Sequence, residues 1–197
     1  DFSDFTGKTT GEVTWGHTLD QQVTTHLKAA TAYRAPSAND LAYGTSQNLV
    51  LRPEANRAFE AGVRYKNADP RGPNWTLVAF ENNLTDLIDY DPNDNYKTFN
   101  IAKARTRGLE LGVEARPTKS VRLFGTATSL QTKALTDYLG VIATGESLLR
   151  RPTFTLSAGA EITPDERWSF GTGFTLLHGR VDFDWDNFRR VDLPNSL

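Results

Sequence analysis

Alternation of apolar and polar residues, in segments long enough to cross a membrane, most constrains how this 197-residue chain can fold. Two clear apolar series are Phe154, Leu156, Ala158, Ala160, Ile162 and Trp168, Phe170, Phe174, Leu176, each interleaved with small or polar residues. Successive side chains on a strand point to opposite faces, so each segment has one apolar and one polar face. A soluble sheet turns its apolar face inward, whereas a membrane barrel turns it outward around a polar interior.

Similar patterns along the chain predict about eight strands and no helix. The predicted strands cover residues 11–19, 23–35, 56–65, 75–90, 98–115, 121–132, 153–162 and 168–181. Residues 75–90 and 121–132 alternate less cleanly, and the sequence leaves their faces unassigned. We therefore expect an all-β fold, with an antiparallel sheet of about eight strands forming part of a larger transmembrane barrel. A self-closed eight-stranded barrel is a lesser alternative, because its filled lumen would need inward side chains larger than those of the strand glycines.

The predicted connections alternate between two kinds. Tight or turn-rich segments lie at residues 20–21, 67–74, 117–119 and 164–166, and longer ones at 36–54, 91–96, 133–151 and 182–190. Outer-membrane barrels have short periplasmic turns and longer extracellular loops. The alternative is a soluble β-sandwich that binds carbohydrate or protein, and such a fold has no reason to sort its connections by end. The alternation therefore favours the barrel.

The polar positions of several strands support the same choice. They include Glu60, Gly62 and Arg64 in one strand, Glu110, Gly112 and Glu114 in another, and Glu161 in a third. Buried in a soluble core, such charges destabilise the fold unless they are paired. In a water-filled lumen they cost little. Aromatic residues that begin strands, such as Trp75 and Trp168, are typical of the girdles that flank a lipid band.

Composition excludes several classes of function. The net charge is −2 and no basic stripe dominates, which argues against a nucleic-acid partner. No run of about 18 apolar residues is present to form a transmembrane helix. The chain has no cysteine, and its three histidines lack metal-ligand spacing. The acidic run at 182–186 lacks the glycine and terminal glutamate of a helical calcium loop. We expect no enzyme activity, no cofactor and no metal site.

Three segments, in order, resemble TonB-dependent outer-membrane receptors. Residues 30–54 contain Tyr-Arg-Ala-Pro at 33–36, Tyr-Gly at 43–44 and Leu-Arg-Pro-Glu at 51–54. Residues 84–115 contain Asp-Leu-Ile at 86–88, an Asn at 100 and Ala-Arg-Thr-Arg-Gly-Leu-Glu at 104–110. Leu-Leu-Arg-Arg-Pro at 148–152 and the stretch at 86–90 are most similar to the cobalamin receptors of this family.

This resemblance implies a Gram-negative outer-membrane protein that crosses the membrane with many strands. Residues 1–197 would be a partial barrel domain, about the twelfth to nineteenth strands of about 22, with the plug domain and the final strands outside it. The implied function is TonB-dependent uptake of a bulky, scarce nutrient, with cobalamin as the first choice and a ferric siderophore as the alternative. The implied partners are that ligand, TonB acting through the plug, and outer-membrane lipid.

Five residues are predicted to bind the ligand. The resemblance places Tyr43, Thr45 and Ser46 among ligand-facing residues in the long segment at 36–54. Arg150 and Arg180 lie at the outer ends of predicted strands and could donate hydrogen bonds to a ligand amide or phosphate, or pair with the plug. The alternative role for both arginines is to solvate the rim above the lipid band.

Overall fold

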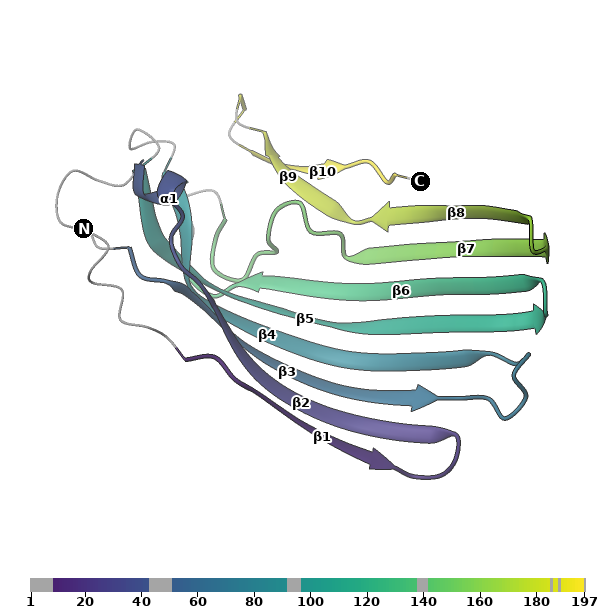
Figure 1. Ribbon diagram of the computed structural model, residues 1–197. Helices are drawn as coiled ribbons and strands as arrows, with labels where there is room; N and C mark the ends of the chain where they lie inside the picture. Colours follow the sequence, from purple (N-terminus) through teal and green to yellow (C-terminus); the bar gives the residue numbers. More distant parts are fainter. Residues whose placement is uncertain are drawn as a thin grey trace.

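A computed structural model describes residues 9–42, 51–91, 97–137, 142–184, 186–187 and 189–196. One antiparallel sheet of eight strands dominates it, with the strands side by side in sequence order (Figure 1). The strands are β1 (Glu12–Thr18), β2 (Val23–Arg34), β3 (Glu54–Tyr65), β4 (Asn74–Asp91), β5 (Lys97–Thr118), β6 (Val121–Ala134), β7 (Phe154–Asp165) and β8 (Trp168–His178).

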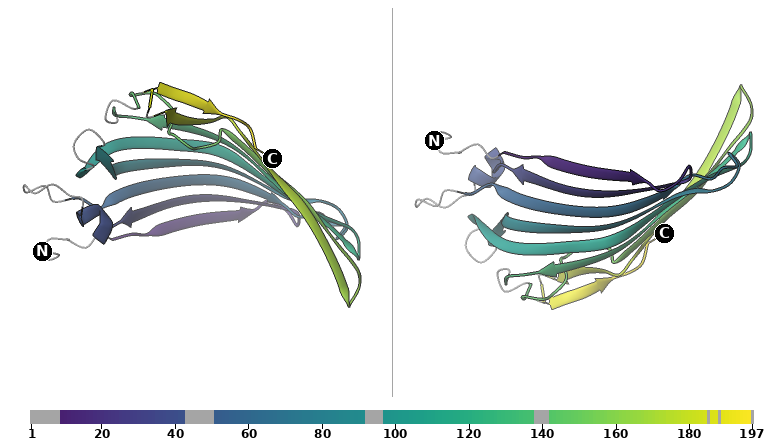
Figure 2. Two further views of the ribbon diagram at one scale, coloured as in Figure 1. Left: turned by 90° about the horizontal axis from the view of Figure 1, so that it is seen from above. Right: turned by 90° about the horizontal axis from the view of Figure 1, so that it is seen from below.

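The predicted eight-stranded antiparallel sheet is confirmed. It is curved and open, with β1 and β8 at its two edges, so it is neither a two-layer sandwich nor a self-closed barrel (Figure 2). The predicted strict alternation of connection lengths is wrong in one place. Residues 92–96, between β4 and β5, are fewer than residues 66–73, between β3 and β4, so connection length does not sort strictly by end.

Aspartate side chains close two of the short turns. The Asp20 carboxylate accepts hydrogen bonds from the backbone N–H groups of Gln22 and Val23, at 2.7 and 2.8 Å. Asp165 does the same for Arg167 and Trp168, at 2.8 and 3.1 Å. These local bonds satisfy turn donors without help from the rest of the sheet, which is why aspartate is favoured in turns.

Strand register assigns the two faces. One cross-strand row joins Trp15, Leu27, Ala61, Ala79 and Leu109 and belongs to the apolar face. The adjacent row joins His26, Gly62, Val78, Glu110 and Thr128 and belongs to the polar face. The predicted polar positions at 60–64 and 110–114 therefore do share a face.

The register also assigns the faces of β4 and β6, which the sequence left open. Phe80 and Phe124 point to the polar face, where their rings cover Gly108 and Gly159. Glu81 and Gln131 lie on the opposite face, near the end of the sheet that carries the longer connections. Both strands thus carry a large aromatic ring on the polar face and a polar side chain on the apolar face, which breaks the simple alternation.

The apolar face is unburied. Trp15, Phe59 and Trp168 are 53%, 54% and 60% exposed, although a soluble protein would bury such side chains. Among the described residues, buried apolar side chains cluster away from the sheet centre: Ala134, Ile142 and Phe183, with Leu148 and Leu149 packed against them. No helix in the described part of the chain is long and apolar enough to cross a membrane.

Two further elements depart from the prediction. A one-turn helix, α1 (Ala38–Ala42), follows β2. The predicted last strand, 168–181, stops at His178, and Gly179 turns the chain with φ of +69°, a conformation that favours glycine. The predicted loop at 182–190 is instead largely a separate hairpin of β9 (Arg180–Asp184) and β10 (Arg189–Leu193).

Candidate functional site

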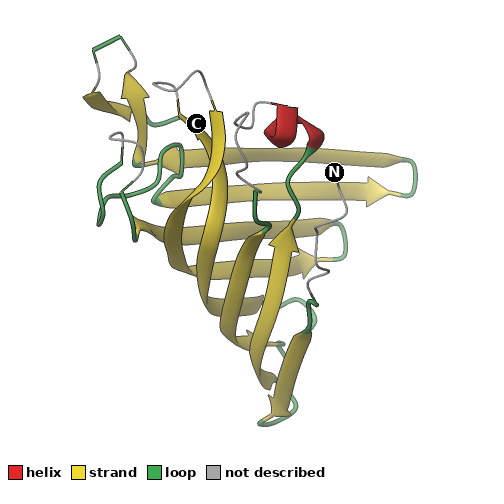
Figure 3. Ribbon diagram, turned by 90° about the vertical axis from the view of Figure 1, so that its left-hand side faces the viewer, coloured by secondary structure: helices red, strands yellow, loops and turns green. Residues whose placement is uncertain are grey.

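Polar side chains gather at the end of the sheet opposite the short turns at 19–22 and 166–167. We call it the loop end, because helix α1 and the β9–β10 hairpin lie there. Helix α1, the segment after β6 and the β9–β10 hairpin all lie at this end, away from the short turns (Figures 1 and 3). Of the five residues predicted to bind ligand, Tyr43, Thr45 and Ser46 fall outside the described residues. Arg150 and Arg180 are described, and both contact the hairpin or the chain that follows it.

Arg150 is held in a defined position but keeps free donors. Its backbone has φ of +57°, its N–H donates to the Val181 carbonyl at 2.7 Å, and its Nε lies 3.0 Å from both carboxylate oxygens of Asp182. The side chain is 70% exposed. Its two terminal nitrogens form no hydrogen bond with any described residue and can reach a ligand.

Two contacts lower the pKa of the Asp182 carboxyl group. The backbone N–H of Phe183 donates to its carboxylate, and together with the Arg150 charge this lowers the pKa of Asp182 against the opposing effect of burial. The carboxylate therefore stays ionised at neutral pH and continues to orient Arg150.

Arg180 has a more structural position. Its Nη2 donates to the Pro194 carbonyl at 3.1 Å and to the Ser196 hydroxyl at 3.2 Å. Its Nε is buried without a hydrogen-bond partner among the described residues. Ser196 also pairs with Leu177 of β8. Arg180 thus holds the segment after β10 against β9, and Ser196 joins that segment to the edge of the sheet.

A second arginine cluster holds helix α1. Arg34 donates to both carboxylate oxygens of Glu54 at 2.8 Å and pairs with Asp40 at 3.0 Å. Asp40 and Ser37 cap the helix reciprocally: the Ser37 N–H reaches the Asp40 carboxylate and the Asp40 N–H reaches the Ser37 hydroxyl. Burial raises the pKa of Asp40, but the Ser37 bonds and the Arg34 charge outweigh burial and lower it overall.

A third cluster joins the chain before β3 to a bulge in β4. Arg52 pairs with Asp86 at 2.6 Å, and Asp86 has φ of +56° where the β4–β5 register shifts. Asn100 donates to the carbonyls of Arg52 and Asp86, both at 2.7 Å, and accepts from the Arg52 N–H at 2.6 Å. The Arg52 side chain is 67% exposed.

Sequence reasoning did not assign these residues to the site. Arg52, Asp86 and Asn100 lie in the motifs that carry the family resemblance, but 48 residues separate Arg52 from Asn100, and only strand register brings them together. Arg190 was also missed. It binds Glu146 at 3.1 Å and the Ser147 carbonyl at 2.9 Å, beside a hollow of about 410 Å³.

A separate ionic network lies on the polar face near the short turns. Arg122 pairs with Glu114 at 2.9 Å and with Glu161 at 3.6 Å, and Arg116 pairs with Glu114 at 3.3 Å. The Arg122 guanidinium stacks 4.8 Å above the Phe124 ring. Two of the carboxylates that the sequence placed on this face, Glu114 and Glu161, are therefore neutralised by arginines of the same face.

The side chains at the loop end are suited to binding a ligand rather than to catalysing a reaction. Arg52, Arg150 and Arg189 expose guanidinium groups there, which suit planar, polar or anionic ligand groups. Within the described ranges, no group of three His, Cys, Asp or Glu residues could hold a metal ion.

Comparisons with known proteins agree with this architecture. The family model "TonB dependent receptor-like, beta-barrel" matches residues 1–196. The fold is similar to that of the ferric-catecholate import receptor Fiu from K12 E. coli, with a TM-score of 0.66 and 16% identity over 86% of this chain and 24% of that one.

Two further solved structures are similar. The ferric yersiniabactin uptake receptor FyuA from Yersinia pestis has a TM-score of 0.67 and 18% identity over 95% of this chain and 28% of that one. The siderophore receptor PiuA from Acinetobacter baumannii has a TM-score of 0.69 and 16% identity over 94% and 28%. This chain thus spans about a quarter of the length of each structure it matches.

An open, curved sheet with an apolar outer face, a polar inner face and longer connections at one end is what part of a large membrane barrel requires. The chain belongs to the TonB-dependent receptor-like β-barrel family of Gram-negative outer-membrane proteins, which are receptors and transporters rather than enzymes.

Proposed function

We propose that the receptor containing this chain imports a ferric siderophore, and that the loop end of the sheet contributes to ligand binding. The observation that carries this proposal is the set of exposed arginines held by carboxylates at that end, above all Arg150. Ferric chelates built from catecholate or carboxylate groups are often anionic. A guanidinium with free terminal nitrogens is suited to orient such a ligand.

The comparisons support the siderophore over the cobalamin that the sequence motifs favoured. Fiu is described as a ferric-catecholate import receptor, FyuA as a ferric yersiniabactin uptake receptor and PiuA as a siderophore receptor. Their low identity to this chain indicates fold and leaves the ligand open. Cobalamin stays the second candidate because Leu-Leu-Arg-Arg-Pro at 148–152 resembles the cobalamin receptors.

Transport would require parts of the receptor outside this chain. A plug domain would occupy the barrel and receive energy from TonB, and the ionic network around Arg122 would face it across the lumen. Tyr43, Thr45, Ser46 and Arg180 stay predicted ligand contacts beside Arg150.

The test is a binding titration of the purified full-length receptor. A ferric catecholate, a ferric hydroxamate and cyanocobalamin would each be titrated against the wild type and Arg150→Gln. We expect the anionic chelate to bind, and we expect its Kd to rise about tenfold in the variant through loss of a charge-assisted hydrogen bond. Arg71→Gln is the matched control, since this exposed cation lies in the turn at the opposite end.

The outcomes separate the two candidates. High-affinity binding of cyanocobalamin, with no binding of either ferric compound, would replace the siderophore with the corrinoid. An unchanged Kd in Arg150→Gln would remove Arg150 from the ligand site, and the double variant Tyr43→Ala, Ser46→Ala would then test the other predicted contacts.

A further inference from the structure

A row of cations crosses the apolar face of the sheet at its loop end. Register places Arg57 of β3 opposite Asn83 of β4, Asn83 opposite Arg105 of β5, and Arg105 opposite Lys133 of β6. Neighbouring strands lie about 4.8 Å apart, so the row spans about 14 Å. It lies on the face that carries the exposed apolar residues, which is the lipid-facing side.

The next row toward the short turns lies on the same face and adds a fourth cation, Arg107. It joins Phe59, Glu81, Arg107 and Gln131. Arg107 donates to the Gln131 side chain at 2.6 Å, while Glu81 accepts from Asn83 at 2.9 Å. Together the two rows hold four cations and one carboxylate.

The cations have no anionic partner among the described residues. No ion pair there involves Arg57, Arg105, Arg107 or Lys133, although arginines elsewhere at the loop end are paired. Arg57, Arg107 and Lys133 are exposed. Unpaired positive charge at the edge of a lipid band is electrostatically complementary to phosphate in the adjoining leaflet.

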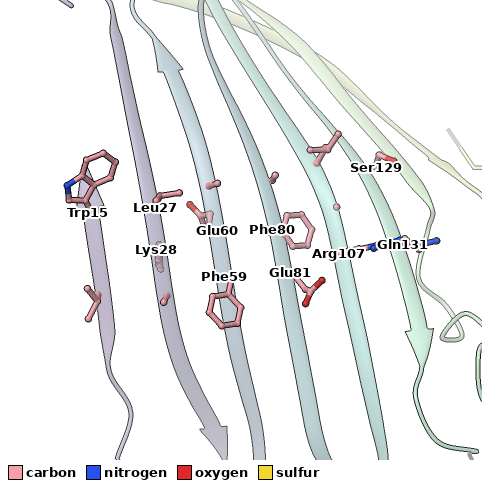
Figure 4. Close-up of a pocket in the computed structure, with 16 residues that line it drawn as sticks. Trp15, Leu27, Lys28, Phe59, Glu60, Phe80, Glu81, Arg107, Ser129 and Gln131 are labelled. Carbon is pink, nitrogen blue, oxygen red and sulfur yellow. Dashed lines mark hydrogen bonds between the residues drawn. The ribbon is translucent and has the colours of Figure 1, made fainter. Parts of the chain in front are cut away.

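A groove lies on the same face and reaches this charged border (Figure 4). Its volume is about 820 Å³. Its lining includes the small side chains of Ala29, Ala61 and Ala79 together with the larger Trp15, Phe59 and Leu109. Glu81, Arg107 and Gln131 also line it, so the groove is apolar along most of its length and polar where it meets the cations.

We propose that this surface is a binding site for a phosphate-bearing lipid of the outer leaflet. The lipid phosphates contact Arg57, Arg105, Arg107 and Lys133, and an acyl chain lies in the groove below. Guanidinium groups bind phosphate oxygens in pairs, and the small side chains leave room for a hydrocarbon chain against the sheet. A soluble anion would need only the cations, whereas the adjoining apolar groove fits a lipid.

The test uses the full-length receptor in detergent and lipopolysaccharide as the phosphorylated probe. The variant Arg57→Gln, Arg105→Gln, Lys133→Gln removes the cationic row. The matched control Arg64→Gln, Lys119→Gln, Arg167→Gln removes equal charge from the short-turn end and the polar face. We expect the row variant to bind lipopolysaccharide about tenfold or more weakly and the control to bind it like the wild type.

Two more arms test the separate parts of the site. Enzymatic removal of the phosphates should weaken binding to the wild type to the level seen with the row variant. Filling the groove with Ala61→Phe, Ala79→Phe should weaken binding of the intact lipid but leave binding of its deacylated, phosphorylated headgroup unchanged. Unchanged circular dichroism and unchanged heat-dependent gel mobility verify that each variant is folded.

Equal binding of lipopolysaccharide by the row variant and the wild type would overturn the proposal. Equal binding of phosphorylated and dephosphorylated lipid would also overturn it, because the cations would then contribute nothing to binding the phosphate groups. Equal binding of inorganic phosphate and intact lipid would reduce the surface to a free-anion site and likewise reject the lipid.

Discussion

At the scale of single residues, close contacts between strands are made possible by glycine on the polar face. The Phe80 ring of β4 lies across Gly108 of β5, with its Cζ only 2.8 Å from where a Cβ would sit, and the Ser129 carbonyl oxygen lies on the same side. Gly112, four residues further along β5, has open space around the same position. The sequence presents both as glycines of one face, but their surroundings differ.

Gly108→Ala should therefore destabilise the receptor, whereas Gly112→Ala should be near neutral. The added methyl at 108 collides with backbone, and overpacking of this kind costs about 1–3 kcal/mol. The two variants would be compared by chemical or thermal unfolding of the full-length receptor in detergent. Equal stability of the two would mean that Phe80 and β6 move aside freely, contrary to the packing described.

At the scale of elements, one side chain joins three segments. Asn100 of β5 bonds to the backbone on either side of the gap between Arg52 and the β4 bulge at Asp86. Glu54 adds a further link by accepting from the Ile88 N–H at 2.8 Å. These bonds hold the chain entering β3 against β4 and β5, and so they position Arg52.

Asn100→Ala should loosen that junction without unfolding the sheet. Three hydrogen bonds are lost, each contributing about 0.5–1.5 kcal/mol, so exchange of the Arg52 amide should accelerate by about tenfold or more. Hydrogen exchange with mass spectrometry on the segment beginning at 51 measures this. Asn74→Ala, which breaks an equivalent side-chain bond in the turn at the other end, should leave the Arg52 amide unchanged.

At the scale of the whole molecule, the sheet is incomplete on its own. Within the described residues, the outer edge of β1 is unpaired and that of β8 is paired only at Leu177, with Ser196. One face of both strands is apolar and exposed. Unpaired backbone N–H and C=O groups in hydrocarbon cost several kcal/mol each, which is why membrane strands occur in closed barrels. The segment needs the remaining strands of a barrel to satisfy both edges.

Residues 9–196 expressed alone should accordingly fail to insert into lipid as a folded monomer. We expect aggregates or edge-paired oligomers in detergent and liposomes, with none of the heat-dependent gel mobility of a closed barrel. Electrophoresis with and without heating, together with analytical ultracentrifugation, makes the measurement. A monomeric, protease-resistant barrel formed by this segment would contradict the open sheet.

Much of the fold was predictable because it depends on period-two alternation and local turn chemistry. The alternation in segments such as 154–162 predicts which face meets lipid. Asp20 and Asp165 close turns by hydrogen bonds to residues next to them in the chain. The hairpin after Gly179 was not predictable from alternation, because one positive φ redirects a segment that otherwise reads as strand. Likewise, alternation could not assign the faces of β4 and β6, because the apolar rings of Phe80 and Phe124 lie on the polar face, where they cover glycines of neighbouring strands.

The sequence by itself determined that this chain forms lipid-facing β-strands of a TonB-dependent receptor, because alternation and motifs are local. Only the tertiary structure decided which distant polar residues meet. Arg52 reaches Asp86 and Asn100, Arg150 meets Asp182, and Arg57, Arg105 and Lys133 form one cationic row. These groupings follow from register between strands, and a shift by one residue would turn each side chain to the opposite face.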